Sequence, residues 1–492
     1  MLQKLAKQSA IYGISTIVGR LLGYLLTPYF TRIFEPEAYG IITDVYAIIP
    51  FALVLLSMGM ESSYFRFATR AEQENPTPEG LKGAMTTLFS TTWALTVATA
   101  VTFCFLVQLF IKPACVAMGE AYVANPEYLE IVAFIILFDV VSMIPFVRLR
   151  QMNRAKSYVM FKLLNIVLQV GLSIGFGLAG LYSTEFGVGW ALVANLIASG
   201  VTFLMLLTTI FKVEFRLNSK LIGALFIYSI PLLLSGIAGT ATDFIDRQMI
   251  KYIIPIGAMA QLGVYGAVTK IAVVMTLFTQ MYRLAAEPFF LSNFKKNDFV
   301  EMNAAAMKYY IMVSVLVFLG ISLFRDLFAL IVGAEYREGI YILPVVLGAN
   351  VCMGVWLNLS FWYKREERTA FALYITLTGL AVAVVANLIF VPRWGYYGAA
   401  WSRLIAEGTM VAVSYYLNCR FFPTPYDLKR IGEYILLGVV LFGLSEMLYP
   451  AIGGGVLNYI VSVVLLSIYL IYAIWREKID VRALLNSVLK RG

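Results

Sequence analysis

Long apolar runs separated by short charged segments constrain this chain more than any other feature of its sequence. A helix needs roughly 20 apolar residues to span the hydrocarbon core of a bilayer. Because 60% of the 492 residues are hydrophobic and only 14% are charged, the chain holds enough apolar sequence for many such spans. Soluble domains carry about 25% charged residues. The sequence therefore predicts an all-α integral membrane protein.

The apolar runs and their charged ends predict fourteen transmembrane helices. Their expected positions are about 8–30, 41–60, 84–110, 128–147, 158–180, 188–210, 224–250, 263–281, 304–324, 340–361, 370–391, 397–418, 432–449 and 456–474. The longest predicted connections, at about 61–83 and 282–303, have roughly 20 residues each. Connections of this size leave no room for a soluble catalytic or nucleotide-binding domain.

Basic residues are distributed unequally between alternate connections. Of the 38 Lys and Arg residues, 26 lie in the N-terminal segment, in every second connection and in the C-terminal segment. Only 6, among them Lys251, lie in the other connections, and the remaining 6 lie inside the predicted spans. Since cytoplasmic segments carry the excess of basic residues, both termini are expected to be cytoplasmic. The net charge of +9 then follows from membrane topology, and no nucleic-acid partner is expected.

A sequence repeat relates the two halves of the chain. Gly19-Arg20 is followed by Ala38-Tyr39-Gly40, and Asp246-Arg247 is followed in the same way by Val264-Tyr265-Gly266. Transporters are often built from two such repeats around a central site. The repeat predicts two six-helix lobes around a central cavity, with two further helices. The expected boundaries are 1–215 for helices 1–6, 216–422 for helices 7–12, and 423–492 for helices 13–14 and a cytoplasmic tail.

The residue inventory excludes several kinds of chemistry. The chain has no histidine, which excludes histidine catalysis and histidine metal sites, and its four cysteines form no C-x-x-C pair. No phosphate-binding glycine motif occurs where a strand could precede it. We therefore expect no enzymatic activity and no cofactor. A transport reaction would draw on a Na+ or H+ gradient, the membrane potential or the gradient of the substrate.

Basic residues inside the predicted spans are the candidate substrate-binding groups. A charge at the bilayer centre costs roughly 2.5–3.5 kcal/mol on insertion scales, so each one needs a physical reason. Five of these six cations, from both halves of the chain, are the candidates, namely Arg20, Lys162, Arg247, Lys270 and Arg403. A cavity that they line would suit an anionic substrate, because guanidinium groups bind phosphate with two hydrogen bonds. The alternative is that they only pair with acidic residues, as Arg403 can with Glu407.

Four acidic residues inside the spans are candidates for ion coupling or for charge pairing: Asp44, Asp139, Asp243 and Asp246. Asp139 lies near the middle of its span without a basic residue on the same helix, which favours an ion or proton site. It could instead pair with Arg20 or Lys270, and Asp44 could also neutralise Arg20. Asp243 lies four residues before Arg247, a spacing that allows an ion pair along one helix.

These features resemble the polysaccharide-transport branch of the multidrug/oligosaccharidyl-lipid/polysaccharide flippase superfamily, which contains the Wzx-type flippases of O-antigen and capsule repeat units. The resemblance rests on short motifs spread over nearly the whole chain: Ser9 to Gly13, Gly19-Arg20, Thr31 to Phe34, Glu37 to Gly40, Asp246-Arg247, Gly263 to Tyr265, Asn387 to Pro392 and Gly398 to Ala400. It implies translocation of an undecaprenyl-diphosphate-linked oligosaccharide across the bacterial inner membrane by alternating access. It further implies that Arg20 and Arg247 hold the diphosphate.

Several functions remain open at this point. A lipid II flippase or a cation-coupled drug exporter belongs to the same superfamily, although a basic cavity argues against the exporter. A polysaccharide polymerase or a glycosyltransferase is also polytopic, but such enzymes normally need a larger external loop. A passive scaffold would not need charges buried in both lobes. The expected partners are the lipid-linked oligosaccharide, membrane lipids and polysaccharide polymerase or assembly proteins, and the protein is expected to be a monomer.

Overall fold

The computed structural model describes residues 23–75, 77–211, 214–294, 298–366, 368, 370–453 and 455–478. These residues form helices joined by short turns, and no strand occurs among them. The all-α fold predicted from the apolar runs is confirmed. The chain divides into two compact units, residues 1–266 and residues 267–492. The predicted lobes describe which helices correspond to each other in the sequence repeat, whereas these units describe which helices pack together. The predicted lobe boundaries therefore stay a prediction.

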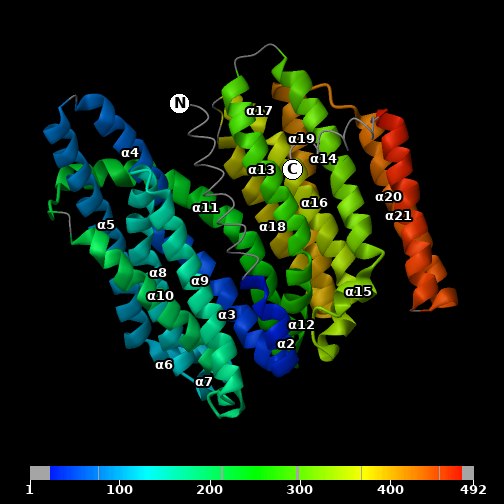
Figure 1. The fold of residues 1–492 in the computed structure, drawn as a ribbon, viewed down its shortest axis with the longest axis horizontal. Coiled ribbons are helices and arrows are strands. Elements are labelled where there is room, and N and C mark those ends of the chain that lie inside the picture. The colour runs from blue at the N-terminus through cyan, green and yellow to red at the C-terminus, as the bar shows by residue number, and fades with distance from the viewer. Residues whose placement is uncertain are drawn as a thin grey trace. The chain divides into compact units, whose positions relative to one another are not determined.

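The first unit consists of a group of long helices around α8 (Figure 1). α8 packs against α5 and α10, α9 packs against α10, and α11 packs against α3. Met60, Tyr64, Phe89 and Ile144 belong to one of its buried apolar clusters. The helices are α2 (Leu26–Ile33), α3 (Pro36–Ser57), α4 (Met60–Glu74), α5 (Pro78–Leu109), α6 (Ile111–Met118), α7 (Glu120–Ala124), α8 (Glu127–Gln151), α9 (Ala155–Leu178), η1 (Leu181–Ser183), α10 (Gly189–Ile210), α11 (Ser219–Ile253) and the first part of α12 (Ala258–Ile271).

The second unit is organised around α16 and α19, which pack against each other, and α18 packs against α19. α20 and α21 lie side by side in Figure 1, and both contact α14. The elements that follow α12 are α13 (Val273–Asn293), α14 (Phe299–Ser322), α15 (Arg325–Ala329), η2 (Ala334–Ile342), α16 (Leu343–Leu359), α17 (Phe361–Arg365), α18 (Ala370–Trp394), α19 (Tyr396–Phe421), α20 (Leu428–Ile452) and α21 (Val456–Glu477).

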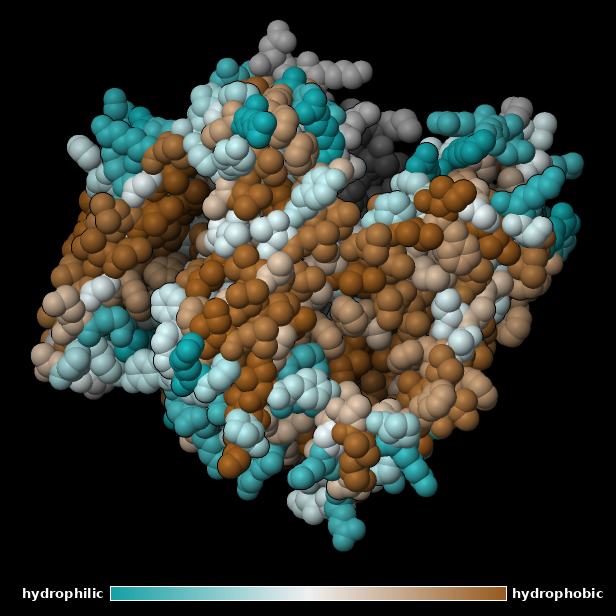
Figure 2. Space-filling model, turned by 180° about the vertical axis from the view of Figure 1, so that it is seen from behind, coloured by the Kyte–Doolittle hydropathy of each residue, from teal (hydrophilic) through white to brown (hydrophobic). Residues whose placement is uncertain are grey.

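The described helices have the length and composition of membrane spans. Eleven of them are long and apolar enough to cross a bilayer, or twelve if α12 and α13, which meet at a bend of 46°, form one span. Figure 2 shows hydrophobic side chains covering the length of the helices, while hydrophilic ones gather toward the helix ends. These features support a multi-pass membrane protein. The first predicted span lies mostly outside the described residues, and the total of fourteen stays a prediction.

Two connections that the sequence analysis treats as loops are helical. Most of the predicted loop at 61–83 is α4, and the predicted loop at 282–303 contains the end of α13 and the beginning of α14. α4 continues the chain beyond the apolar run because it is amphipathic: Tyr64 and Ala68 are buried, whereas Arg66 and Arg70 are exposed. Hydropathy locates the apolar part of a helix and misses such polar extensions.

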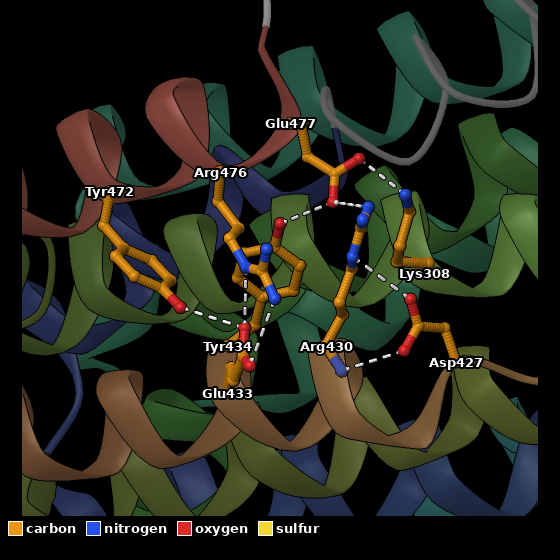
Figure 3. A network of polar contacts seen from close by, with 8 residues as sticks. All are labelled: Lys308, Asp427, Arg430, Glu433, Tyr434, Tyr472, Arg476 and Glu477. Atoms are coloured by element: carbon orange, nitrogen blue, oxygen red, sulfur yellow. Dashed lines mark hydrogen bonds and ion pairs between the residues drawn. The ribbon is translucent and has the colours of Figure 1, made fainter.

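A polar network attaches the two C-terminal helices to α14 (Figure 3). The Glu477 carboxylate at the end of α21 accepts hydrogen bonds from Lys308 Nζ at 2.5 Å, Tyr434 Oη at 2.8 Å and Arg430 Nη1 at 3.2 Å. Arg476 forms a further ion pair with Glu433 on α20. Because the Glu477 side chain is only 3% exposed, its charge is compensated inside the protein. The network orders the end of α21 against α14 and α20.

The repeated Tyr-Gly pairs place α3 and α12 in close contact within the first unit. A Cβ atom on Gly40 would lie 2.0 Å from the carbonyl oxygen of Met259, and one on Gly263 would lie 1.9 Å from that of Pro36. Only glycine permits backbones to approach this closely. The two segments that contain the Tyr-Gly pairs therefore meet near the start of α3. This contact places Tyr265 beside α11.

Candidate functional site

The polar end of α11 holds several of the predicted site residues. Asp246 is fully buried, and its Oδ2 accepts a hydrogen bond from Tyr265 Oη at 3.4 Å. Arg247 is half-buried on the next position of the helix. The residue that matches Arg247 in the other repeat, Arg20, lies outside the described residues, as does the side chain of Asp243. The structure thus places Asp246 and Arg247 at a helix end where α11 meets α12.

Asp44 on α3 is the centre of a buried ion pair with α11. Its Oδ2 accepts hydrogen bonds from Lys251 Nζ at 2.5 Å and from Tyr122 Oη at 2.7 Å. Its Oδ1 accepts a hydrogen bond from Gln248 Nε2 at 2.9 Å. Burial, followed by the charge of Asp44, raises the pKa of the Tyr122 phenol well above its usual range, so this hydroxyl remains protonated and donates. Asp44 therefore connects α3, α7 and α11.

Lys251 is the main residue that the sequence analysis misplaces. It was assigned to an external connection, but it lies inside α11, and its side chain is only 3% exposed. The apolar residues that follow it, Tyr252 to Ile254, are the signal that the helix continues. Lys251 follows Arg247 by four residues, so the two cations lie on adjacent turns of the same helix face. No sequence feature identifies Tyr122 as the third partner of Asp44.

A polar cavity of about 250 Å³ lies between α8, α9 and α10 and contains two of the predicted site residues. Asp139 on α8 and Lys162 on α9 both line it, and Asp139 interacts with Lys162 and with the Ser199 hydroxyl of α10. The Lys162 ammonium also lies 4.5 Å from the centre of the Phe146 ring. Within the first unit, the described cation that interacts with Asp139 is Lys162.

A second ion pair lines the same cavity. Glu61 on α4 and Arg150 at the end of α8 are hydrogen-bonded to each other. The amide of Asn165 donates to the Thr202 hydroxyl at 3.0 Å on the cavity wall. The cavity therefore contains two carboxylates and two cations, without the cationic excess that an anion site requires. Paired carboxylates and amines with nearby hydroxyls can accept and release a proton or a small cation.

The predicted cations of the second unit lie on its long helices. Lys270 is half-buried on α12, and Arg403 is half-buried on α19, four residues before the buried Glu407. Among the residues that the structure describes, no cluster of three or more potential ligand residues could hold a metal ion. The roles of all predicted site residues in binding or coupling stay predictions.

The sequence matches the model of a known protein family. The family model described as "polysaccharide biosynthesis protein" matches residues 5–294, which is more than half of the chain. No curated protein matches the chain in sequence.

Two solved structures with the same architecture are a flippase and a transporter. The lipid II flippase MurJ in an inward closed conformation has a TM-score of 0.73 at 13% identity, with 95% of this chain and 99% of that chain covered. An inward-facing multidrug resistance transporter of the MATE family in the MOP superfamily has a TM-score of 0.68 at 16% identity, with 85% and 95% covered. At these identities the matches show a shared fold.

Proposed function

Because this chain belongs to the polysaccharide biosynthesis protein family, we propose that it is a flippase for undecaprenyl-diphosphate-linked oligosaccharides. It moves repeat units of O-antigen, capsule or exopolysaccharide from the cytoplasmic to the outer leaflet of the bacterial inner membrane. It works by alternating access, with both termini in the cytoplasm. The family match over residues 5–294 carries this proposal.

The arrangement of charges supports transport rather than scaffolding. Asp44, Asp139, Asp246 and Lys251 all sit in helices of the first unit and make polar contacts with other helices. Buried charges of this kind are costly in a membrane and usually mark a pathway or a moving contact. In the proposed cycle, Arg20 and Arg247 hold the diphosphate of the cargo.

Coupling to an ion gradient is assigned to the cavity that contains Asp139 and Lys162. When Asp139 is charged, it attracts the Lys162 ammonium on the neighbouring helix. Protonation of the carboxyl group removes this attraction, and Glu61 is then the acidic residue that still acts on the ammonium. The contact between α8 and α9 then responds to proton binding, which is the property that a coupling site needs.

The variant Asp139→Asn tests this coupling role. The amide imitates the protonated carboxyl group, so transport should no longer respond to pH, whereas the protein should still fold because Asn can accept the bond from Ser199. The measurement is the initial transport rate in proteoliposomes as a function of pH, between about pH 5.5 and 8.

Asn165→Ala is the matched control, since Asn165 lines the same cavity but does not titrate. This variant should keep the pH response of the wild type. A wild-type pH response in Asp139→Asn, or a large fall in its melting temperature, would show that Asp139 only holds helices together.

The cargo itself is tested by reconstitution with labelled substrates. Proteoliposomes should translocate a fluorescent polyprenyl-diphosphate oligosaccharide at least about tenfold faster than protein-free vesicles, a difference that corresponds to about 1.4 kcal/mol. Labelled lipid II and a cationic dye are tested in parallel in the same vesicles. Faster movement of lipid II would instead favour a peptidoglycan-precursor flippase, and movement of the dye alone would favour a drug exporter.

A further inference from the structure

A second cavity of the first unit differs from the Asp139 cavity in its charge. It has a volume of about 240 Å³ and lies where α8 ends, α9 begins and α10 ends. Two arginines, Arg148 and Arg154, line it together with the hydroxyl-bearing residues Ser157, Thr208 and Thr209. No acidic residue is among its lining residues. A cavity of this composition has the chemistry of an anion site.

The turn between α8 and α9 places both arginines at the cavity. Asn153 adopts the left-handed conformation with a φ of 57°, and the Arg154 backbone N–H donates to the Leu149 carbonyl at 2.9 Å. This bond folds the chain back over the last turn of α8, so that Arg154 lies near Arg148. The two positive charges repel each other.

Arg148 is held in position by its surroundings. Its Nη1 donates to the Thr209 carbonyl at 3.1 Å, and its guanidinium group lies 4.6 Å from the centre of the Phe89 ring. A guanidinium group has five N–H donors, so this single bond leaves several of them for a ligand. Within the described part of the chain, neither Arg148 nor Arg154 forms an ion pair with a carboxylate. The like charges are therefore not compensated by the protein.

The position of the cavity indicates where its ligand comes from. The turn between α8 and α9 is on the predicted cytoplasmic side, at the level where lipid headgroups begin. Pro145, Leu149 and Phe161 form apolar parts of the wall. Two exposed apolar side chains, Met152 and Met160, lie close by along the chain. A ligand with a negatively charged headgroup and an apolar tail would match both parts of this surface.

We propose that this cavity binds the phosphate group of an anionic phospholipid from the cytoplasmic leaflet, with Arg148 and Arg154 as the binding residues. The hydroxyl group of Ser157 donates a further hydrogen bond to a phosphate oxygen, whereas the hydroxyl groups of Thr208 and Thr209 donate to the carbonyls of Met205 and Leu206. The bound lipid neutralises the two arginines and joins the ends of α8, α9 and α10. This site is separate from the proposed cargo site and does not depend on which cargo the protein carries.

The test compares lipid binding by the purified full-length protein and by the variant Arg148→Gln/Arg154→Gln. Native mass spectrometry follows the binding of dioleoylphosphatidylglycerol and of dioleoylphosphatidylcholine. The variant should bind phosphatidylglycerol at least about tenfold more weakly, because it loses two charged donors. Phosphatidylcholine binding should fall by less than phosphatidylglycerol binding, because the ammonium group of choline offsets the charge of its phosphate.

A matched control removes the same charge from the same side of the membrane. Lys82→Gln/Lys220→Gln affects two exposed residues outside the cavity and should bind phosphatidylglycerol like the wild type. Equal weakening in this control would show that only overall charge matters and would overturn the proposal. If the double variant does not fold, the single variant Arg154→Gln is tested in its place, because the Arg154 side chain is exposed.

Competition with inorganic phosphate distinguishes a phospholipid headgroup from free phosphate as the ligand of this cavity. If the ligand is a lipid, about 10 mM phosphate should leave phosphatidylglycerol binding unchanged, because the free ion lacks the apolar contacts that the tail provides. Displacement of the lipid by free phosphate would overturn the assignment to a phospholipid. Unchanged phosphatidylglycerol binding in both arginine variants would overturn the site altogether.

Discussion

Lys251→Ala is expected to lower the melting temperature of the protein by on the order of 10 °C. Asp44 and Lys251 are 0% and 3% exposed, and their charged atoms are 2.5 Å apart. Removing one partner from such a pair leaves a buried charge without compensation, which costs about 3–5 kcal/mol. Gln248 and Tyr122 would still donate to Asp44, but neither carries a positive charge. The measurement is thermal unfolding in nanodiscs of fixed lipid composition.

The double variant Asp44→Asn/Lys251→Met distinguishes the contribution of the ion pair to stability from the cost of leaving one charge unpaired. It removes both charges and keeps an acceptor for Tyr122, so it should regain most of the lost stability. Arg216→Ala is the control, because Arg216 and Glu214 form an exposed pair in the same unit. Exposed pairs contribute about 0–1 kcal/mol. If Lys251→Ala unfolds at the wild-type temperature, the pair does not stabilise the contact between α3 and α11.

Arg247→Ala is expected to reduce export of the lipid-linked oligosaccharide by about tenfold or more. A diphosphate offers several acceptor oxygens, and each charge-assisted hydrogen bond contributes about 1.5–3 kcal/mol. Arg247→Lys should restore transport only in part, because an ammonium group lacks the planar pair of donors. Arg20→Ala should have a similar effect, since Arg20 holds the corresponding place in the repeat. The measurement is surface polysaccharide in a strain that lacks its own flippase.

Membrane levels of each variant must be measured alongside this assay. Removing a charge from a span lowers its insertion cost, so neither variant should be lost from the membrane. Arg337→Ala, at an exposed position, is the control and should export normally. If Arg20→Ala and Arg247→Ala both display polysaccharide at wild-type levels, these arginines do not bind the diphosphate.

The apolar runs alone predict an all-α membrane protein, and they locate most of its long described helices. Apolar runs report helices well because the bilayer sets both their length and their composition. The predicted run at 188–210 and α10 at Gly189–Ile210 differ by a single residue. Polar extensions such as α4 were missed because amphipathic segments outside the bilayer have no such constraint. The sequence also selected Asp44, Asp139 and Lys162 as individual residues, since a charge in an apolar run is conspicuous.

The tertiary structure decided which of these charges meet. Lys251 was read as a loop residue, yet its partner Asp44 lies 207 positions earlier in the chain, and Tyr122 joins the same carboxylate across 78 positions. Asp139 and Lys162 were recognised separately, but only the packing of α8 beside α9 makes them neighbours. Hydropathy and spacing describe one helix at a time. The partner of a buried charge depends on how helices are rotated and packed against each other, and that information exists only in three dimensions.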